Sequence, residues 1–503
     1  MESFLFLFIS VALIILGALN YKISIAITKF EFFCIVFILY LVLRSLFTYQ
    51  FDISFISYLL FLAILYFGLK AFFLKNRITV SLILFFAAVI ILLIYIIFAI
   101  CYFYNDTDRI TNQYLQNKSI FSILLASQIA LAIPLCLYFK AKKPSLRFVC
   151  WILLGVIVSA TGLLGLTNGR SGWLGFSLAI FYIAYHYLNN RRFKKAILYF
   201  ALPAGILFLV LLVWYKQGSS NGRLLIYKVS AGMLKDHWIF GIGSGQFKVQ
   251  YNQSQAAYFA THSIDSKEAL LADTTFYAFN DFFQFIIENG LPGFLILVAV
   301  MFVLVQQIKQ TVLKPENKHL FIASTASFIC IVTGSLFSYP LQIFPIVFQA
   351  VVCLSIIGSF PSGSGLKIDF LKNVKIPGIV LLLIGVCLCI QFYFYFQFSR
   401  KSLQAFELGR SGFKQRAIEK YKELNDAIIK DGNVLYLYAQ QLYYSNQPGY
   451  AAQVLSNAKN YYCSNNVYKL SAEIENELKH YSQAEKDYQT AVYMVPNRML
   501  SRY

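Results

Sequence analysis

Residues 79–103 read TVSLILFFAAVIILLIYIIFAICYF and include no charged side chain. A membrane-spanning helix needs roughly 20 mostly apolar residues, because each residue adds 1.5 Å to a helix that crosses a core about 30 Å thick. This stretch therefore predicts a transmembrane helix, and the rest of the chain can be read outward from it.

The same apolar pattern recurs along the chain and predicts an all-α, polytopic membrane protein of about 12 transmembrane helices. The first candidate span has no positive residues before it and no small-residue cleavage site after it. We therefore interpret it as a span rather than a signal peptide. The predicted spans are residues 3–19, 30–48, 54–74, 79–103, 119–139, 148–167, 171–188, 196–215, 291–308, 320–338, 343–360 and 376–397.

The composition supports this class. Hydrophobic residues make up 58% of the 503 residues and charged residues only 13%, against about 45–50% and about 25% in soluble domains. A soluble enzyme and a disordered chain are thereby excluded. Nine cysteines are too sparse for a disulfide framework. Cys387 and Cys389 could suggest a metal site, but two small buried thiols are the simpler interpretation.

The net charge of +20 would suggest nucleic acid in a soluble protein. Here the basic residues cluster in short loops at every second crossing, and the positive-inside rule places those loops in the cytoplasm. The alternate loops, including 104–118 and the long neutral segment 216–290, are then external. The basic loops are residues 70–77, 140–147, 191–195, 309–318 and 367–375.

The composition changes near residue 398, and a repeat of 33 to 34 residues follows. Ala417, Ala451 and Ala484 each precede a bulky residue at +4 and a small or apolar residue at +7, which places the three on one helix face. The spacing resembles that of tetratricopeptide repeats, with an ordinary array of helical hairpins as the alternative. We expect residues 1–397 to form the membrane domain and residues 398–503 an extramembrane α-helical repeat domain that binds a partner or acceptor.

Residues 216–290 are too long for a simple connection, which favours a functional role. An amphipathic helix is predicted after Gly222, ended by the glycines of Gly241-Ile242-Gly243-Ser244-Gly245. We do not interpret these glycines as a nucleotide-binding loop, because no strand precedes them and the segment is predicted to be external. A tight turn near the membrane surface is the default interpretation.

Three elements in this order resemble the O-antigen ligase family, which also contains O-antigen polymerases and bacterial protein O-oligosaccharyltransferases. The resemblance covers roughly residues 120–360. The elements are Thr167-Asn168-Gly169-Arg170-Ser171-Gly172-Trp173, then Arg223-x-x-x-Tyr227 leading to Asp236-His237-Trp238-x-x-Gly-x-Gly-x-Gly-x-Phe247, and Asn280-x7-Glu288-x-Gly290.

The resemblance implies an all-helical, metal-independent membrane glycosyltransferase of the GT-C-like type, with no cofactor. Its donor is a glycan on undecaprenyl diphosphate, and its acceptor is the lipid A core, another glycan, or a protein Ser/Thr. It also implies a multi-pass protein of the bacterial inner membrane, with the long loop and the C-terminal domain in the periplasm. The leading interpretation is a ligase or oligosaccharyltransferase, and the alternatives are an O-antigen polymerase, a 12-span transporter of glycan precursors, and a non-enzymatic scaffold.

The family's arginines match Arg170 and Arg223, and both residue types suit the chemistry. A diphosphate leaving group needs fixed cations, and guanidinium pairs with phosphate oxygens in a bidentate, always charged geometry. The simpler interpretation of Arg170 is a side chain that extends to lipid headgroups. We expect both arginines to stabilise charge on the departing diphosphate.

The base for the acceptor hydroxyl stays open, because many ligases of the family carry His directly before the Asn that matches Asn280, whereas this chain has Phe279. Substrate contacts are expected from Asn280, Gly241, Gly243 and Tyr227. Glu288 could instead orient an arginine. The candidates for the base are Asp281, His262, Glu288 and His237.

Overall fold

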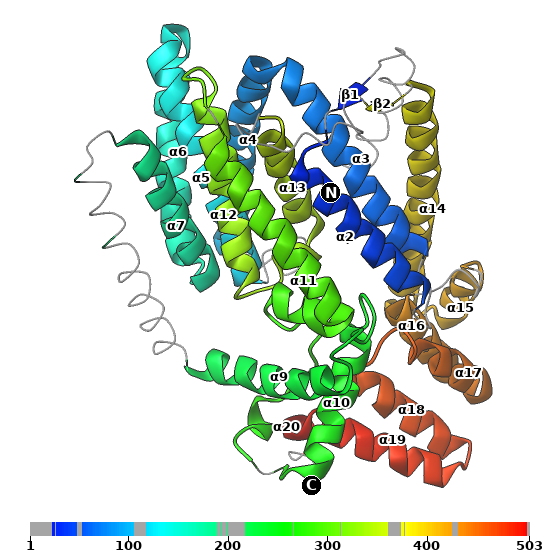
Figure 1. Cartoon of the computed structure of the whole chain (residues 1–503). Coiled ribbons are helices and arrows are strands. Elements are labelled where there is room, and N and C mark those ends of the chain that lie inside the picture. The colour runs from blue at the N-terminus through cyan, green and yellow to red at the C-terminus, as the bar shows by residue number, and fades with distance from the viewer. Residues whose placement is uncertain are drawn as a thin grey trace.

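The computed structural model describes residues 23–25, 27–47, 53–104, 117–188, 192, 199, 217–264, 266–311, 313–360, 374–376, 378–424 and 431–499. Across these ranges the chain is almost entirely helical (Figure 1). The predicted all-α class is therefore confirmed, with one small addition. Two three-residue strands, β1 (Ile23–Ile25) and β2 (Val374–Ile376), pair antiparallel with Ile23 opposite Ile376.

Six described helices are long and apolar enough to cross a membrane, and they lie in α3, α4, α5, α6, α11 and α12. The predicted total of twelve spans stays a prediction, because 3–19 lies outside the described residues and 196–215 lies almost entirely outside them. The helices of this part are α2 (Lys29–Leu46), α3 (Ile53–Lys75), α4 (Arg77–Tyr104), α5 (Lys118–Lys142), α6 (Arg147–Leu166), α7 (Arg170–Tyr187), α11 (Asp281–Gln310), α12 (Lys318–Ser335), α13 (Phe344–Gly358) and α14 (Gly378–Arg410), with short turns η1 (Pro144–Leu146) and η3 (Pro340–Gln342).

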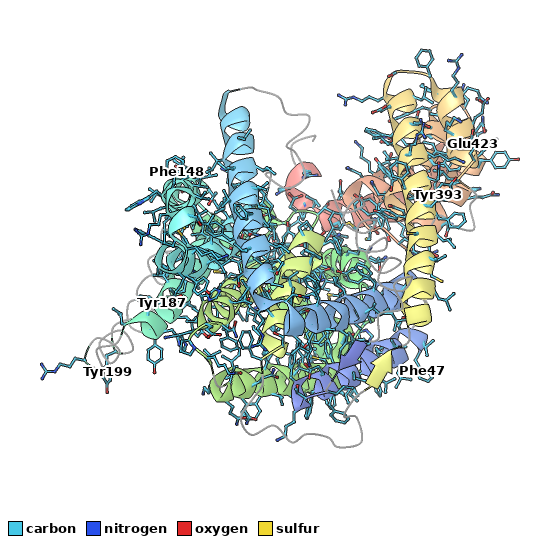
Figure 2. The ribbon with its side chains drawn as sticks, turned by 90° about the horizontal axis from the view of Figure 1, so that it is seen from above. Phe47, Phe148, Tyr187, Tyr199, Tyr393 and Glu423 are labelled. Atoms are coloured by element: carbon cyan, nitrogen blue, oxygen red, sulfur yellow. The ribbon has the colours of Figure 1, made fainter. Side chains whose placement is uncertain are left out.

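Helices α5 and α12 form the centre of the bundle. Nearly nine tenths of the α5 span is buried inside the protein, compared with 39% of the α6 span. Large apolar side chains at the periphery, such as Phe148 (75% exposed) and Tyr393 (57% exposed), point outward (Figure 2). This distribution suits a bundle whose outer surface faces lipid, because a lipid-facing helix has no reason to bury its apolar side chains in protein.

The segment between α7 and α11 folds into α9 (Gln217–Asp236), α10 (Phe247–Thr261) and the turn η2 (Ala269–Leu271), at one end of the bundle (Figure 1). The amphipathic helix predicted after Gly222 is confirmed as α9. Its apolar face packs Leu225, Val229 and Met233 against Phe247 and Tyr251 of α10. The predicted long loop is thus a small folded unit with a hydrophobic core of its own.

The C-terminal region consists of helical hairpins, but α14 runs without a break across the predicted domain boundary at 397/398. Ala417, Ala451 and Ala484 are all buried, as the repeat pattern requires. The assignment to tetratricopeptide repeats itself stays a prediction. The helices are α15 (Lys414–Lys422), α16 (Gly432–Tyr443), α17 (Pro448–Ala458), α18 (Asn465–Glu477), α19 (Tyr481–Met494) and α20 (Pro496–Met499).

Candidate active site

Arg170 and Arg223 lie near each other although they come from different helices. Arg170 is the first residue of α7, and its Nη1 donates a hydrogen bond of 3.3 Å to Ser220 Oγ in the first turn of α9. Arg170 is also close enough to Arg223 for their charges to interact. Two neighbouring guanidinium groups repel each other, and an anion bound between them offsets this repulsion. The pair therefore provides a favourable position for an anion.

Arg223 is held on α9 against the segment that precedes α11. Its Cζ lies 5.3 Å from the centroid of the Phe279 ring, and Tyr227 OH donates a 3.4 Å hydrogen bond to Phe279 O. Burial lowers the pKa of Arg223, and nearby Tyr227 acts in the opposite direction. The guanidinium is thus cationic but poorly solvated, which strengthens its attraction for a bound anion. We call Arg170, Ser220, Arg223, Tyr227 and Phe279 the arginine cluster.

Phe279 occupies the position where the resemblance led us to look for a base. Its backbone has φ of +54°, in the left-handed region, and its ring packs edge-on against Tyr339 with centroids 5.4 Å apart. Tyr339 in turn stacks on Tyr277 at 4.0 Å and hydrogen-bonds Asn117 at the start of α5. The position lies beside Arg223, but it presents an aromatic ring instead of a proton acceptor.

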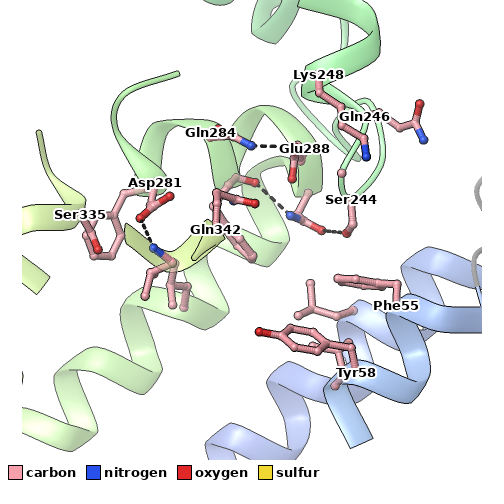
Figure 3. Close-up of a pocket in the computed structure, with 18 of the residues that line it drawn as sticks. Phe55, Tyr58, Ser244, Gln246, Lys248, Asp281, Gln284, Glu288, Ser335 and Gln342 are labelled. Atoms are coloured by element: carbon pink, nitrogen blue, oxygen red, sulfur yellow. Dashed lines mark hydrogen bonds between the residues drawn. The ribbon is translucent and has the colours of Figure 1, made fainter. Parts of the chain in front are cut away.

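A cavity of about 1050 Å³ lies between α2, α3, α11, α12 and α13 (Figure 3). One part of its lining is apolar and comes from the bundle helices. The other part is polar and is contributed by the start of α11, the glycine-rich loop and the turn after α12. Such a combination suits a ligand with an apolar body and a polar head. The polar lining residues include Ser244, Gln246, Lys248, Asp281, Ser335 and Gln342.

Asp281 is the buried carboxylate at this polar end. Its side chain is only 6% exposed, and Oδ2 accepts a 2.9 Å hydrogen bond from the backbone N–H of Leu341 (Figure 3). Oδ1 is buried and has no hydrogen-bond partner among the described residues, although Ser335 and Gln342 lie alongside. A buried, half-satisfied carboxylate among the residues that line a cavity is a candidate functional group.

Glu288 has partners within the protein. Its Oε1 accepts hydrogen bonds from the Phe247 backbone N–H at 3.3 Å and from Gln284 Nε2 at 3.1 Å. Ser244 Oγ donates to Asn289 Oδ1 at 2.7 Å, next to Glu288 along α11 (Figure 3). Glu288 therefore ties the glycine-rich loop to α11, and these bonds favour a structural role over that of a base.

The glycine-rich loop closes around a break in α11. Gly290 has φ of +71° inside that helix, and the loop supplies the missing backbone partners. Ile242 and Gly243 donate to the carbonyls of Ile287 and Glu288, both at 2.9 Å, and Leu291 donates to Trp238 O at 3.0 Å. A Cβ on Gly241 would lie 2.4 Å from the Glu288 backbone. Gly241 and Gly243, predicted as substrate contacts, thus pack backbone against backbone and do not line the cavity.

Replacing Gly290 by alanine should lower the thermal stability of the whole protein. The new Cβ would lie 2.0 Å from Ile239 O, and the left-handed backbone alone costs about 1–2 kcal/mol for a residue with a Cβ. The matched control is Gly232→Ala, where a Cβ meets nothing within 4 Å and the helical position of α9 favours alanine. Thermal unfolding in detergent, followed by tryptophan fluorescence, should show a lower Tm only for Gly290→Ala. Equal Tm values would contradict this role for Gly290.

The remaining predicted residues lie apart from the arginine cluster or have structural contacts. His262 ends α10, where its ring stacks on Tyr258 with centroids 4.0 Å apart and is exposed. His237 is also exposed. The side chain of Asn280 accepts a 3.0 Å hydrogen bond from the Phe283 backbone N–H and so caps the start of α11. None of the three lines the cavity.

Several neighbours of the site were not predicted from the sequence. Ser220 contacts Arg170, Tyr339 packs on Phe279, and Tyr461 from the C-terminal region lines the cavity. None of these three residues is part of a motif that we quoted, and the fold brings all three to the site. The one available signal was for Ser220, which directly precedes the Asn221-Gly222-Arg223 run.

Residues 154–298 match the family model described as O-antigen ligase. This match confirms the predicted family resemblance over a stretch that contains both arginines, Asp281 and Glu288. Neither a curated protein nor a solved structure matches the chain at a significant level.

Proposed function

We propose, from the O-antigen ligase domain at residues 154–298, that this chain transfers a glycan from undecaprenyl diphosphate to an acceptor at the external face of the bacterial inner membrane. The transfer inverts the anomeric centre and needs no metal. The family and the six apolar helices support a membrane glycosyltransferase of the ligase or polymerase type. The observation that carries the finer proposal is the approach of Arg170 to Arg223.

The arginine cluster suits the diphosphate of the donor. Charge builds up on the diphosphate as its bond to the sugar breaks, and fixed cations near that position lower the barrier. Arg170 also begins α7, so the unpaired backbone N–H groups and the dipole of that helix add to the positive potential. Two guanidinium groups and a helix N-terminus together can hold both phosphates during departure.

Asp281 is our choice for the group that accepts the proton. The acceptor hydroxyl oxygen attacks the anomeric carbon, the bond from that carbon to the diphosphate oxygen breaks, and undecaprenyl diphosphate leaves with the bonding electrons. The hydroxyl proton passes to the buried carboxylate of Asp281, which lies among the lining residues of the cavity.

The lipid A core and a protein Ser/Thr are both candidate acceptors, and the end of another glycan is the alternative in a polymerase. We propose that residues 1–397 form the membrane domain with its catalytic segment 216–290 outside, and that the repeat domain of residues 398–503 lies in the periplasm. The basic loops predicted to be cytoplasmic support this orientation.

The test is a glycan profile of a strain that lacks the gene, with the wild-type gene restored as the control. We expect the deletion to remove glycan from one class of acceptor while lipid-linked donor accumulates. Loss of lipopolysaccharide O-chains indicates a ligase, single-repeat chains indicate a polymerase, and bare glycoproteins indicate an oligosaccharyltransferase. An unchanged profile of all three, with no donor accumulation, contradicts the proposal.

A further inference from the structure

The turn between α17 and α18 of the C-terminal region reaches the cavity. Asn460 and Tyr461 of this turn line it, together with Gln246, which directly precedes α10, and Lys248 in the first turn of α10. The repeat region thus contributes side chains to the same space that Asp281 faces. A domain that only recruited a partner would not need to line this cavity.

The turn is held in place by buried contacts. The side chain of Asn252, fully buried on α10, donates a 2.8 Å hydrogen bond to Cys463 O. The ring of Tyr462 stacks on Phe276 with centroids 5.3 Å apart. Cys463 itself is fully buried in a small apolar cluster with Val249 of α10. These contacts fix Asn460 and Tyr461 at the cavity.

A second set of contacts seats the last helices of the chain on the same unit. Gln255, buried on α10, donates a 2.6 Å hydrogen bond to Met494 O. Asn497 donates to Leu270 O at 2.9 Å, and Arg498 pairs with Asp273 at 2.8 Å. The Asn252 and Gln255 amides thus place their hydrogen bonds inside the buried contact between α10 and the C-terminal region. These contacts hold the last helices against α10 and η2.

We propose that the turn at residues 459–464 determines the acceptor specificity of this protein. The turn contacts the sugar head group of an amphipathic acceptor. The inference rests on the proposed function. If the acceptor hydroxyl lies at Asp281, the adjoining sugars occupy the polar part of the cavity, where Asn460 and Tyr461 stand. A tyrosine ring covers the apolar face of a sugar, and an amide exchanges hydrogen bonds with its hydroxyls. The apolar walls from α2, α3 and α13 accommodate the lipid part.

The turn should affect the acceptor and not the donor. The donor diphosphate is assigned to the arginine cluster, none of whose residues lines the cavity. An effect confined to the acceptor therefore distinguishes specificity from a general loss of structure.

The experiment uses the purified full chain in lipid nanodiscs, with undecaprenyl-diphosphate glycan as donor and lipid A core without O-chain as acceptor probe. Tyr461→Ala and Asn460→Ala should each raise the KM for lipid A core, and its Kd in a separate equilibrium measurement, by about tenfold. The donor KM should change by less than about twofold. The matched controls are Tyr450→Ala and Asn466→Ala, exposed positions on the same region that do not line the cavity.

Asn460 is exposed, so its replacement tests the inference even if Tyr461→Ala alters the fold of the turn. Unchanged acceptor KM and Kd in both variants would overturn the inference, as would an equal rise for donor and acceptor. A wild-type protein that transfers glycan but does not bind lipid A core would overturn the assignment of a sugar-headed amphiphile. A wild-type protein that binds lipid A core in a Tyr461-dependent way but transfers nothing would refute the proposed function and leave the binding site in place.

Discussion

Arg170→Ala and Arg223→Ala are each expected to lower the rate constant of glycan transfer by about 10²–10³-fold, with expression and thermal stability close to wild type. Removal of one fixed donor from a developing anion costs about 2.7–4 kcal/mol in comparable sites. Both guanidinium groups lie near one position and act on one leaving group. The double variant should therefore lose much less than the product of the two single losses.

The measurement is single-turnover release of undecaprenyl diphosphate by purified protein. The matched control is Arg416→Ala on the repeat region, where an exposed arginine lies 5.6 Å from the Phe413 ring, almost as Arg223 lies over Phe279. This control should keep wild-type turnover. If either active-site variant also keeps it, or if the two losses multiply fully, the arginines do not share one diphosphate.

Lysine at position 170 or 223 should recover only part of the lost rate. Lysine keeps the positive charge but cannot offer the planar pair of N–H groups that engages two phosphate oxygens. Such an intermediate rate separates bidentate recognition from a general electrostatic effect.

The sequence was enough to predict the long apolar helices that the structure describes, because a run of apolar residues is a local property of the sequence. It was less informative about α11, which we expected to begin at residue 291. The helix begins at Asp281 and breaks at Gly290, because the glycine-rich loop satisfies the backbone groups that the break leaves free. That compensation is a tertiary contact, and no window of sequence displays it.

The site was predicted in part for a similar reason. Arg170, Arg223 and the position of Phe279 were found through motifs, and the fold brings Arg223 close to both of the others. The cavity and its contact with Tyr461 were not predicted, because they form between segments far apart in the chain. A motif lies within one segment of the sequence, whereas a cavity is lined by residues from several segments.

The repeat region shows the same limit. Ala417, Ala451 and Ala484 are buried as their spacing predicts, but Tyr488, at the corresponding +4 position of the last repeat, is 37% exposed. Only the short α20 follows α19 within the described residues, so no further repeat covers this side chain. Asn252 is a polar residue, yet it is fully buried, and its amide donates a hydrogen bond to the docked C-terminal region. Periodicity thus predicted the faces within the repeats but not the surface on which they dock.

Asp281→Asn should lower the rate constant of transfer by about 10²–10⁴-fold, the usual contribution of a general base. Asparagine keeps an oxygen that can accept the Leu341 N–H, so the start of α11 should stay folded. Phe279→His places an imidazole beside Arg223, where the family resemblance locates a base. Added to Asp281→Asn, it should recover at least about tenfold of the lost rate, since a second base is then within reach of the acceptor.

The pH profile identifies which base is at work. In the Asp281→Asn, Phe279→His double variant, the rate should fall as the pH drops through the pKa of the new imidazole, because the protonated ring cannot accept a proton. That pKa is about 6.5 in an unperturbed histidine, and the Arg223 cation lowers it. The control is Asp236→Asn, which removes an exposed carboxylate at the end of α9 and should leave both the rate and the pH profile unchanged.

Wild-type turnover in Asp281→Asn would exclude the Asp281 carboxylate as the base. A recovered rate without the imidazole-dependent fall would mean that position 279 acts on the acceptor through packing against Tyr339 instead of proton transfer.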